Sequence, residues 1–237
     1  MTPYEELGAR YLAVKREVEK ACAEAGKPAQ SVCLLAAVKY ATAEEINYLH
    51  REFGLCDIGE NRVQTFLDHY EKLEDTDGFR VHFIGTLQKN KVKYIVGKTA
   101  LIHSVDSAEL AREIDRQAEK RGIVQDVLIE INSGEEDSKS GVSPDGVAAL
   151  AGAVAALPHL CLRGFMTMGP KYAAEDDYFA NFSKTYRLAL DIWTEKLHNI
   201  GIPIISMGMT DSLLPAIRAG SGMVRIGRAI FGNNISK

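Results

Sequence analysis

The feature that most restricts the fold of this chain is a regular alternation of short apolar runs with helical segments. Eight runs have the length of buried strands and are bounded by glycine, proline or polar clusters. They lie at residues 34–38, 56–59, 81–84, 101–104, 127–131, 160–168, 202–206 and 223–226. Because most of them are followed by a helical segment, the pattern predicts a parallel sheet that closes into a (β/α)8 TIM-type barrel.

Residues 4–25 predict an extra helix at the amino terminus, since apolar residues recur on one helical face at Leu7, Tyr11, Val14 and Val18. The chain ends at Lys237, soon after the eighth run, which leaves little room for a full last helix. We therefore expect the amino-terminal helix to cover that gap. We also expect residues 1–237 to form one domain.

Two other helical segments are expected around the barrel. A basic helix is predicted over residues 87–96, where Lys89, Lys91 and Lys93 recur, and the longest helix over residues 175–199. The lysines are interpreted as a solvated helix face, and a second ligand or a partner is the open alternative. The polar stretch 132–141 predicts a binding loop or lid of unassigned role.

Composition excludes several classes of protein. The 237 residues are 46% hydrophobic and 25% charged, with a net charge of −4. That balance argues against a nucleic-acid partner held by a broad basic surface. No apolar run approaches the ~20 residues of a membrane span, and the acidic start MTPYEELGAR does not resemble a signal peptide. The four cysteines are scattered without zinc spacing, so we expect a cytoplasmic protein without a metal site.

Lys39 stands directly after the first apolar run, LLAAV. Polar groups at the carboxyl ends of barrel strands face the site in this fold. A lysine in low-dielectric surroundings tends to lose its proton, and a neutral amine attacks carbonyl groups. The alternative is a lysine that lays its stem on apolar neighbours and keeps its charge in water.

The seventh and eighth runs lead into segments suited to phosphate. They read Ser206-Met-Gly-Met-Thr210 and Gly220-Ser-Gly-Met-Val-Arg-Ile-Gly227-Arg228. Loops at these positions of the barrel often bind phosphate, because glycine lets the backbone approach an anion and a helix start offers free N–H groups. A tight turn at Gly227 is the structural alternative. A lysine beside such loops indicates an aldehyde phosphate held as a Schiff base, and pyridoxal phosphate is one such ligand.

Seven segments in order give the chain a wider resemblance. They are LLAAVKY (34–40), GENRVQ (59–64), HFIGTLQKNKVK (82–93), IEINSGEEDSKSGV (129–142), LRGFMTM (162–168), SMGMTDS (206–212) and MVRIGRAIFG (223–232). Together they resemble the pyridoxal-phosphate homeostasis protein family, which is related to the barrel domain of bacterial alanine racemases. The resemblance covers essentially the whole chain.

The resemblance implies a role for several residues. Lys39 would form the internal aldimine with pyridoxal 5'-phosphate (PLP), and Asn61 would lie near the cofactor ring. Arg225 would face the pyridine nitrogen, and the phosphate would lie at Ser206, Gly208 and Gly227. Two positions depart from the family: Val38 replaces a hydroxyl residue before the lysine, and Arg228 replaces one after the last-strand glycine. Arg228 is therefore either a phosphate ligand or a solvent-facing arginine.

Three functions are considered for such a site: a PLP carrier, a PLP-dependent amino-acid racemase and a Schiff-base aldolase. The resemblance implies a carrier for intracellular cofactor homeostasis without clear enzymatic activity, so no catalytic residue is assigned. The racemase is the principal alternative. We expect a monomer whose partners are PLP and apo forms of PLP enzymes, and which binds neither nucleic acid nor membranes.

The histidines form no clear site in the sequence. His82 is interpreted as a hydrogen-bonded core residue. The others are interpreted as isolated, at His50, His69, His103, His159 and His198.

Overall fold

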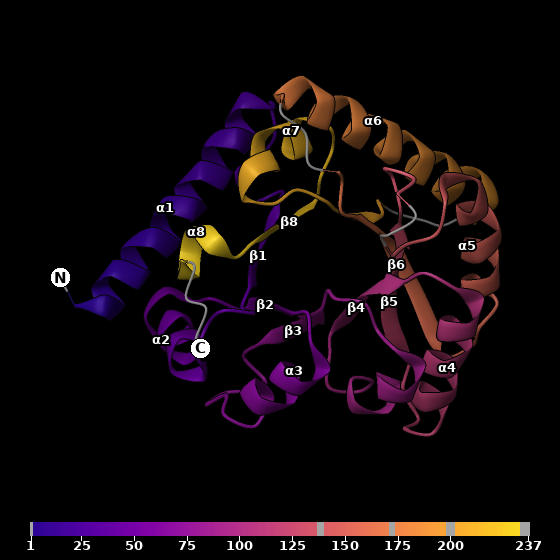
Figure 1. Cartoon of the computed structure of the whole chain (residues 1–237), viewed down its shortest axis with the longest axis horizontal. Helices are drawn as coiled ribbons and strands as arrows, with labels where there is room; N and C mark the ends of the chain where they lie inside the picture. The colour runs from indigo at the N-terminus through magenta and orange to yellow at the C-terminus, as the bar shows by residue number, and fades with distance from the viewer. Residues whose placement is uncertain (1, 137–139, 171–173, 198–201, 233–237) are drawn as a thin grey trace.

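The eight apolar runs form eight parallel strands, and hydrogen bonding between the first and the last closes them into a barrel (Figure 1). The computed structural model describes residues 2–136, 140–170, 174–197 and 202–232. The strands are β1 (Cys33–Ala37), β2 (Asp57–Glu60), β3 (Arg80–Phe83), β4 (Leu101–Val105), β5 (Gln125–Ile131), β6 (Leu160–Thr167), β7 (Ile204–Ser206) and β8 (Met223–Ile226). The predicted barrel is confirmed.

Helices cover the outside of the barrel, as Figure 1 shows. The α-helices are α1 (Pro3–Glu24), α2 (Ala43–Phe53), α3 (Val63–Tyr70), α4 (Ala108–Glu119), α5 (Val147–Ala155), α6 (Glu175–Asp191), α7 (Leu213–Arg218) and α8 (Arg228–Phe231). Short 3-10 helices are η1 (Lys89–Tyr94), η2 (Pro144–Gly146) and η4 (Thr210–Ser212), and η3 (Ile192–Lys196) is a π-helical turn. None of the helices in the described ranges has the length and apolar character needed to span a membrane.

The amino-terminal helix lies where it was expected. α1 packs against α7 and against the four-residue α8, so it covers the side of the barrel next to β8 and β1 (Figure 1). Its buried stripe includes Leu7, Tyr11, Val14 and Val18. The Arg10 Nε donates to the carbonyl oxygen of Ile230 at 2.7 Å, which ties α1 to α8.

Three predicted elements differ from the structure. The basic segment forms only the short 3-10 helix η1: no side chain caps its start, and Gly97, with φ of 79°, follows it. β7 begins at Ile204 because Pro203 offers no N–H to a neighbouring strand. α6 ends at Asp191 and continues as the π-helical turn η3, and the end of the predicted helix lies outside the described residues.

Apolar side chains form two regions, one outside the barrel strands and one inside the barrel. The main core fills the layer between the strands and the helices. A small second cluster joins Leu101, Leu128 and Met166, with Ile204 packed against it. These four residues come from β4, β5, β6 and β7 and alternate along their strands with residues of the main core, so they plug the barrel interior.

An ion pair fixes β2 to α3 within the main core. Glu60 is fully buried, and its Oε1 lies 2.5 Å from His69 Nδ1. Burial opposes the charge on His69, but the hydrogen bond and charge of Glu60 outweigh it and raise the pKa of His69. Burial also raises the pKa of the Glu60 carboxyl. The structure thus corrects the interpretation of His69 as isolated.

We expect His69→Leu to lower the free energy of unfolding by about 3–5 kcal/mol at pH 6, because it leaves the Glu60 carboxyl buried without its partner. Urea titration measures the loss. The control is Lys72→Gln, which removes an exposed ion pair with the neighbouring Asp68 and should change the free energy of unfolding little.

The same pair predicts a pH dependence. A raised native pKa means that the contribution of His69 is fully present below the unfolded-state value of about 6.5 and is lost as the pH rises through the native value. The stability difference between wild type and His69→Leu should therefore shrink at alkaline pH. An equal difference at pH 6 and pH 9 would contradict the assignment.

Candidate functional site

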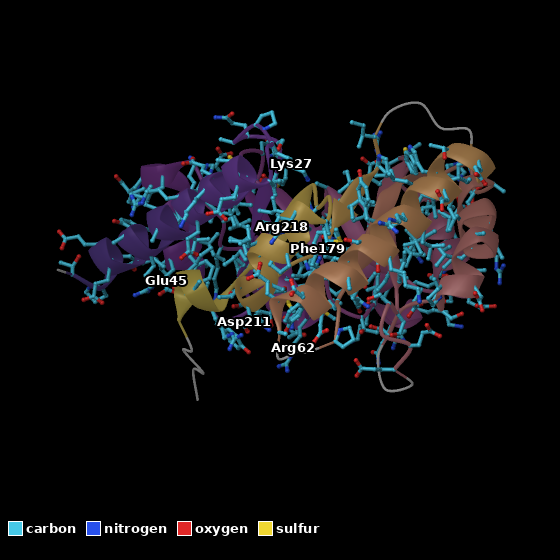
Figure 2. The ribbon with its side chains drawn as sticks, turned by 90° about the horizontal axis from the view of Figure 1, so that it is seen from above. Lys27, Glu45, Arg62, Phe179, Asp211 and Arg218 are labelled. Atoms are coloured by element: carbon cyan, nitrogen blue, oxygen red, sulfur yellow. The ribbon has the colours of Figure 1, made fainter. Side chains whose placement is uncertain are left out.

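The carboxyl ends of the strands meet at one face of the barrel. Figure 2 shows Arg62, which follows β2, and Asp211, which follows β7, along the same lower edge of the molecule. Lys27, which precedes β1, lies at the opposite edge. The predicted site residues after β1, β2, β7 and β8 therefore share this face.

Lys39 follows β1 by two residues and lies in a turn. Its side chain is exposed, with Nζ 4.9 Å from the ring centroid of Tyr40. The structure thus shows a freely accessible amine, and the burial that sequence reasoning invoked to activate it is not seen here.

The end of β8 lies beside the end of β1, which Lys39 follows. β1 and β8 pair in register from Cys33 with Met223 to Ala36 with Ile226, so Gly227 comes next to Ala37. A Cβ atom on Gly227 would stand 2.9 Å from the Ala37 carbonyl oxygen. A larger residue would therefore fill the space between the end of β8 and the backbone that leads to Lys39.

The loop after β7 also depends on a glycine. Gly208 has φ of 98°, a left-handed conformation that other residues rarely adopt, and a Cβ there would lie 2.5 Å from Ala216 Cβ. Its carbonyl oxygen accepts a hydrogen bond from the Arg225 N–H at 3.0 Å. Thr210, which begins η4, is exposed. The sharp turn at Gly208 thus brings an exposed hydroxyl close to the end of β8.

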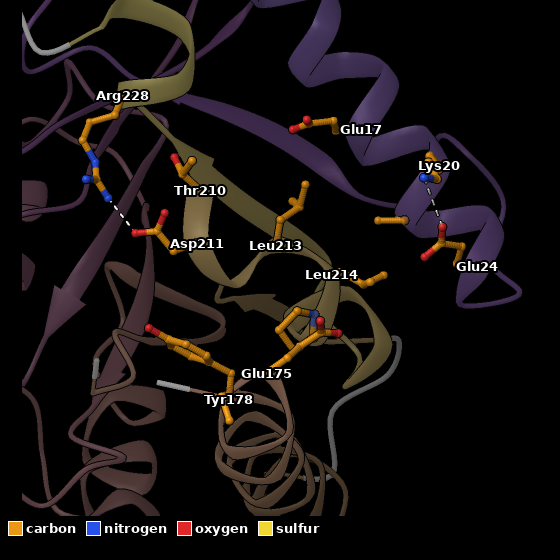
Figure 3. A pocket seen from close by; sticks show the side chains of 13 residues that line it. Glu17, Lys20, Glu24, Glu175, Tyr178, Thr210, Asp211, Leu213, Leu214 and Arg228 are labelled. Atoms are coloured by element: carbon orange, nitrogen blue, oxygen red, sulfur yellow. Dashed lines mark hydrogen bonds and ion pairs between the residues drawn. The ribbon is translucent and has the colours of Figure 1, made fainter. Parts of the chain in front are cut away.

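Arg228 occupies the rim of this region. Its guanidinium donates to Asp211 Oδ2 at 2.7 Å (Figure 3). Both side chains are more than half exposed. Beside them lies a cavity of about 710 Å³ between α1, α6 and α7. Figure 3 shows Glu17, Lys20 and Glu24 on one wall and Tyr178 on another. Because the walls carry charges of both signs, the cavity does not define one class of ligand.

Asn61 lies on the other side of the face, in the bend after β2. It is half-buried, and a Cβ on Gly85 would stand 2.1 Å from its carbonyl oxygen, so the loops after β2 and β3 touch through their backbones. Asn61 lines a cavity of about 450 Å³ that also contains Arg62, Thr86 and Lys91. One lysine of the basic cluster thus faces the surroundings of a predicted site residue.

Ser206 and Arg225 form the floor of the site. Both are buried, and the Arg225 Nη1 donates at 2.8 Å to the carbonyl oxygen and to Oγ of Ser206. The Nη2 donates to the Thr167 carbonyl oxygen at 2.9 Å. Burial lowers the pKa of Arg225 to about 10, against the opposing effect of the Glu130 carboxylate, so it remains a cation at neutral pH. Ser206 supports Arg225 from below, a role that sequence reasoning did not assign to it.

Several polar residues inside the barrel were missed by sequence reasoning. His103 lies between His82 and Ser206, which corrects its interpretation as isolated. Glu130 is buried, and its Oε1 accepts a hydrogen bond from Ser140 at 2.9 Å. Burial raises the pKa of this carboxyl, while Ser140 and Arg225 oppose the rise. The available signal was a polar residue at an inward-facing position of an otherwise apolar strand.

The remaining histidines lie away from this face or outside the described residues. The His50 Nδ1 contacts the Leu55 carbonyl oxygen at 2.7 Å. His159 lies 3.6 Å from Asp115, and His198 is outside the described residues.

The residues at this face fit an aldehyde that carries a phosphate. Glycines at 208 and 227 keep space at two adjoining loops, and a Cβ would fill that space. The first N–H groups of a helix start have no intrahelical partner and suit an anion. An exposed lysine, Lys39, follows the end of β1 next to Gly227, and a buried cation, Arg225, lies in β8 two residues before Gly227.

Comparison with known proteins gives a consistent result. Residues 41–235 match the family described as alanine racemase, N-terminal domain. The pyridoxal phosphate homeostasis protein of Aquifex aeolicus is 43% identical over 222 residues, which cover 92% of this chain and 94% of that protein.

Two solved structures are similar over nearly the whole chain. A Bifidobacterium adolescentis protein described as unknown is 34% identical with a TM-score of 0.87, covering 96% of this chain and 95% of that one. PipY of Synechococcus elongatus PCC7942, solved with PLP bound, is 25% identical with a TM-score of 0.82, covering 95% and 100%.

Proposed function

Because the chain belongs to the pyridoxal phosphate homeostasis protein family, we propose that it binds PLP and buffers or delivers this cofactor inside the cell. The observation that supports the proposal is the register of β1 and β8, which brings Gly227 next to Ala37, two residues before Lys39. When bound, PLP supplies an electrophilic aldehyde to which an amine can add. We further propose that the protein acts as a monomer in the cytoplasm and that apo forms of PLP enzymes are its recipients.

The proposal assigns each part of the site a task. Lys39, whose side chain is exposed, would hold the cofactor covalently through its Nζ. Asn61 would lie near the ring, and Arg225 would offer a donor to the pyridine nitrogen. An arginine has N–H donors and no acceptor, so it can bind that nitrogen without giving it a proton.

Phosphate is proposed to bind between the two glycine loops. Gly208 and Gly227 allow close backbone approach, and Thr210 adds a hydroxyl donor. Arg228 is proposed as a phosphate ligand that exchanges Asp211 for the phosphate. That exchange costs little, because the pair with Asp211 is exposed and such pairs contribute little to stability. The bonds of Ser206 to Arg225 and His103 support a role beneath the ring in place of direct phosphate contact.

An amino-acid racemase is the second candidate, and the match to the alanine racemase domain is the observation that favours it. Racemisation needs acid/base groups that take and return a proton at the substrate carbon. Lys39 can serve as one of them, but Arg225 does not release its proton. The carrier is favoured by a relative that matches along 94% of its length and is named a pyridoxal phosphate homeostasis protein.

Lys39→Ala should abolish the visible absorbance of the protein with PLP and the adduct trapped by borohydride, because it removes the amine that attacks the aldehyde. Mass spectrometry of the reduced, digested protein locates the adduct. Lys91→Ala is the matched control, since Lys91 lies near Asn61 at the same face, and it should keep both signals. A full adduct on another lysine of the wild-type protein would refute the assignment.

Gly227→Val should weaken PLP binding at least tenfold, because its side chain would fill the space beside the Ala37 carbonyl oxygen. Loss of one charge-assisted hydrogen bond, roughly 1.5–3 kcal/mol, is enough for that change. Equilibrium titration measures the dissociation constant, and circular dichroism checks the fold. The control is Gly222→Val, because a Cβ there meets nothing nearer than 3.9 Å. Equal affinities for the two variants would contradict the phosphate site.

PLP-loaded protein should not turn over L-alanine at enzymatic rates. Incubation in deuterated water, followed by NMR and chiral analysis, measures α-proton exchange and D-alanine formation. The carrier predicts rates well below the range of about 1–10³ per second that is ordinary for enzymes. Turnover within that range would replace the carrier with the racemase.

A further inference from the structure

A continuous line of polar contacts crosses the barrel interior, from the amino-terminal end of β2 to Arg225. Asp57 Oδ1 lies 3.2 Å from His82 Nε2, and His82 Nδ1 lies 2.9 Å from His103 Nε2. His103 Nδ1 then lies 3.2 Å from Ser206 Oγ, which accepts from the Arg225 Nη1 at 2.8 Å. Both histidines are buried, and His103 and Ser206 are fully enclosed.

The two ends of this line set the direction of its hydrogen bonds. Asp57 accepts at one end: burial alone would raise the pKa of its carboxyl, but hydrogen bonds from His82 and Arg80 outweigh burial and hold the pKa far below its usual range. Arg225 donates at the other end, since a guanidinium has no acceptor. Burial is the largest cause that keeps the pKa of His103 well below its ordinary value, and the nearby Arg225 cation lowers it further, so His103 is neutral.

Counting hydrogens leaves one arrangement in which both histidines are neutral. His82 must carry its proton on Nε2 to donate to the Asp57 carboxylate, so its Nδ1 accepts. His103 must then donate from Nε2, and its Nδ1 accepts the hydroxyl proton of Ser206. The Ser206 oxygen is left with its lone pairs toward Arg225. Each of the four contacts has one hydrogen, and none is left over.

We propose that His82 and His103 are positioning residues for the cofactor site. Because Asp57 accepts a hydrogen bond from His82, each histidine is held in one tautomer, and Ser206 must donate to His103. The Ser206 oxygen is then free to accept from Arg225 and hold it in place. A serine that turned its proton toward Arg225 would present a donor to a donor and would lose that bond. This line of hydrogen bonds therefore lets Asp57, at the opposite end of the barrel, fix the arrangement of Ser206 and Arg225. The role toward PLP rests on the proposed function, but the tautomers themselves are a property of the protein alone.

The first test uses the protein without cofactor. Two-dimensional ¹⁵N–¹H NMR of histidine-labelled protein reports which ring nitrogen carries the proton, and it should show the Nε2–H tautomer for His82 and His103. Asp57→Asn should convert both rings to a mixture, because an amide can donate or accept at that point. Arg80→Gln is the control: it removes an exposed partner of Asp57 but keeps the carboxylate, so both tautomers should persist. An Nδ1–H tautomer at His103 in the wild-type protein would overturn the proposal.

The second test measures PLP binding. His103→Leu should weaken binding about tenfold and move the ¹⁵N resonance of a labelled pyridine nitrogen, because Ser206 loses its acceptor. His103→Asn places an amide oxygen near the Nδ1 position, so it should recover most of the affinity and the resonance. Equal defects in the two variants would indicate a purely structural role and would overturn the proposal.

A double-mutant cycle separates the effect of the hydrogen-bonded line from the effect of local packing on PLP binding. Ser206→Ala should weaken binding in the wild-type background but add little in the His103→Leu background, because both changes break the same chain. Additive losses would overturn the coupling. If His103→Leu does not fold, His82→Gln replaces it in the cycle. If the wild-type protein failed to bind PLP, the proposed function would be wrong. The tautomers measured in the apo-protein would still show whether the hydrogen bonds of the line run in the proposed direction.

Discussion

A cation buried inside the barrel is the constraint on which the arrangement of the site depends. Arg225 is enclosed among eight strands, and a buried charge is tolerated only where hydrogen bonds replace the water that it has lost. The carbonyl oxygens of Thr167 and Ser206 and the hydroxyl of Ser206 supply them, and Glu130 adds a carboxylate nearby. Groups of β6 and β7 therefore hydrogen-bond this guanidinium, and the apolar cluster around Leu128 fills another part of the barrel interior.

Closure of the barrel turns this local constraint into a site. β8 carries Arg225 inward and ends at Ile226, just before Gly227, while its pairing with β1 brings the backbone before Lys39 alongside. Ala37 and Gly227, far apart in the sequence, thus become neighbours through the pairing of β1 with β8. α1 protects this seam from outside, and the bond from Arg10 to Ile230 ties the first helix to the last. Stability of the seam and geometry of the site are therefore the same physical requirement.

The barrel and the place of Lys39 were predictable because they follow from short-range regularities. Strand-length apolar runs, helix starts and a polar residue at a strand end all leave a local signal, and closure then dictates which strands adjoin. The interior chain leaves no such signal. Asp57, His82, His103 and Ser206 come from four strands, and their contacts depend on strand register and inward direction, which a one-residue slip would reverse. The exposure of Lys39 was also unpredictable, since it depends on how far the surrounding loops rise above the barrel.

The candidate site combines a rigid floor with an adjustable rim, and electrostatics explains the difference. Arg225 is enclosed, so moving it would leave a charge without partners, at a cost of several kcal/mol. Arg228 and Asp211 face water, where an ion pair contributes at most about 1 kcal/mol and either group can be solvated alone. For the proposed ligand, which carries both a ring and a phosphate, Arg225 would be a fixed donor and Arg228 a movable cation. Such a division suits a protein that must hold a cofactor in one orientation and also release it, because release needs movement only at the rim.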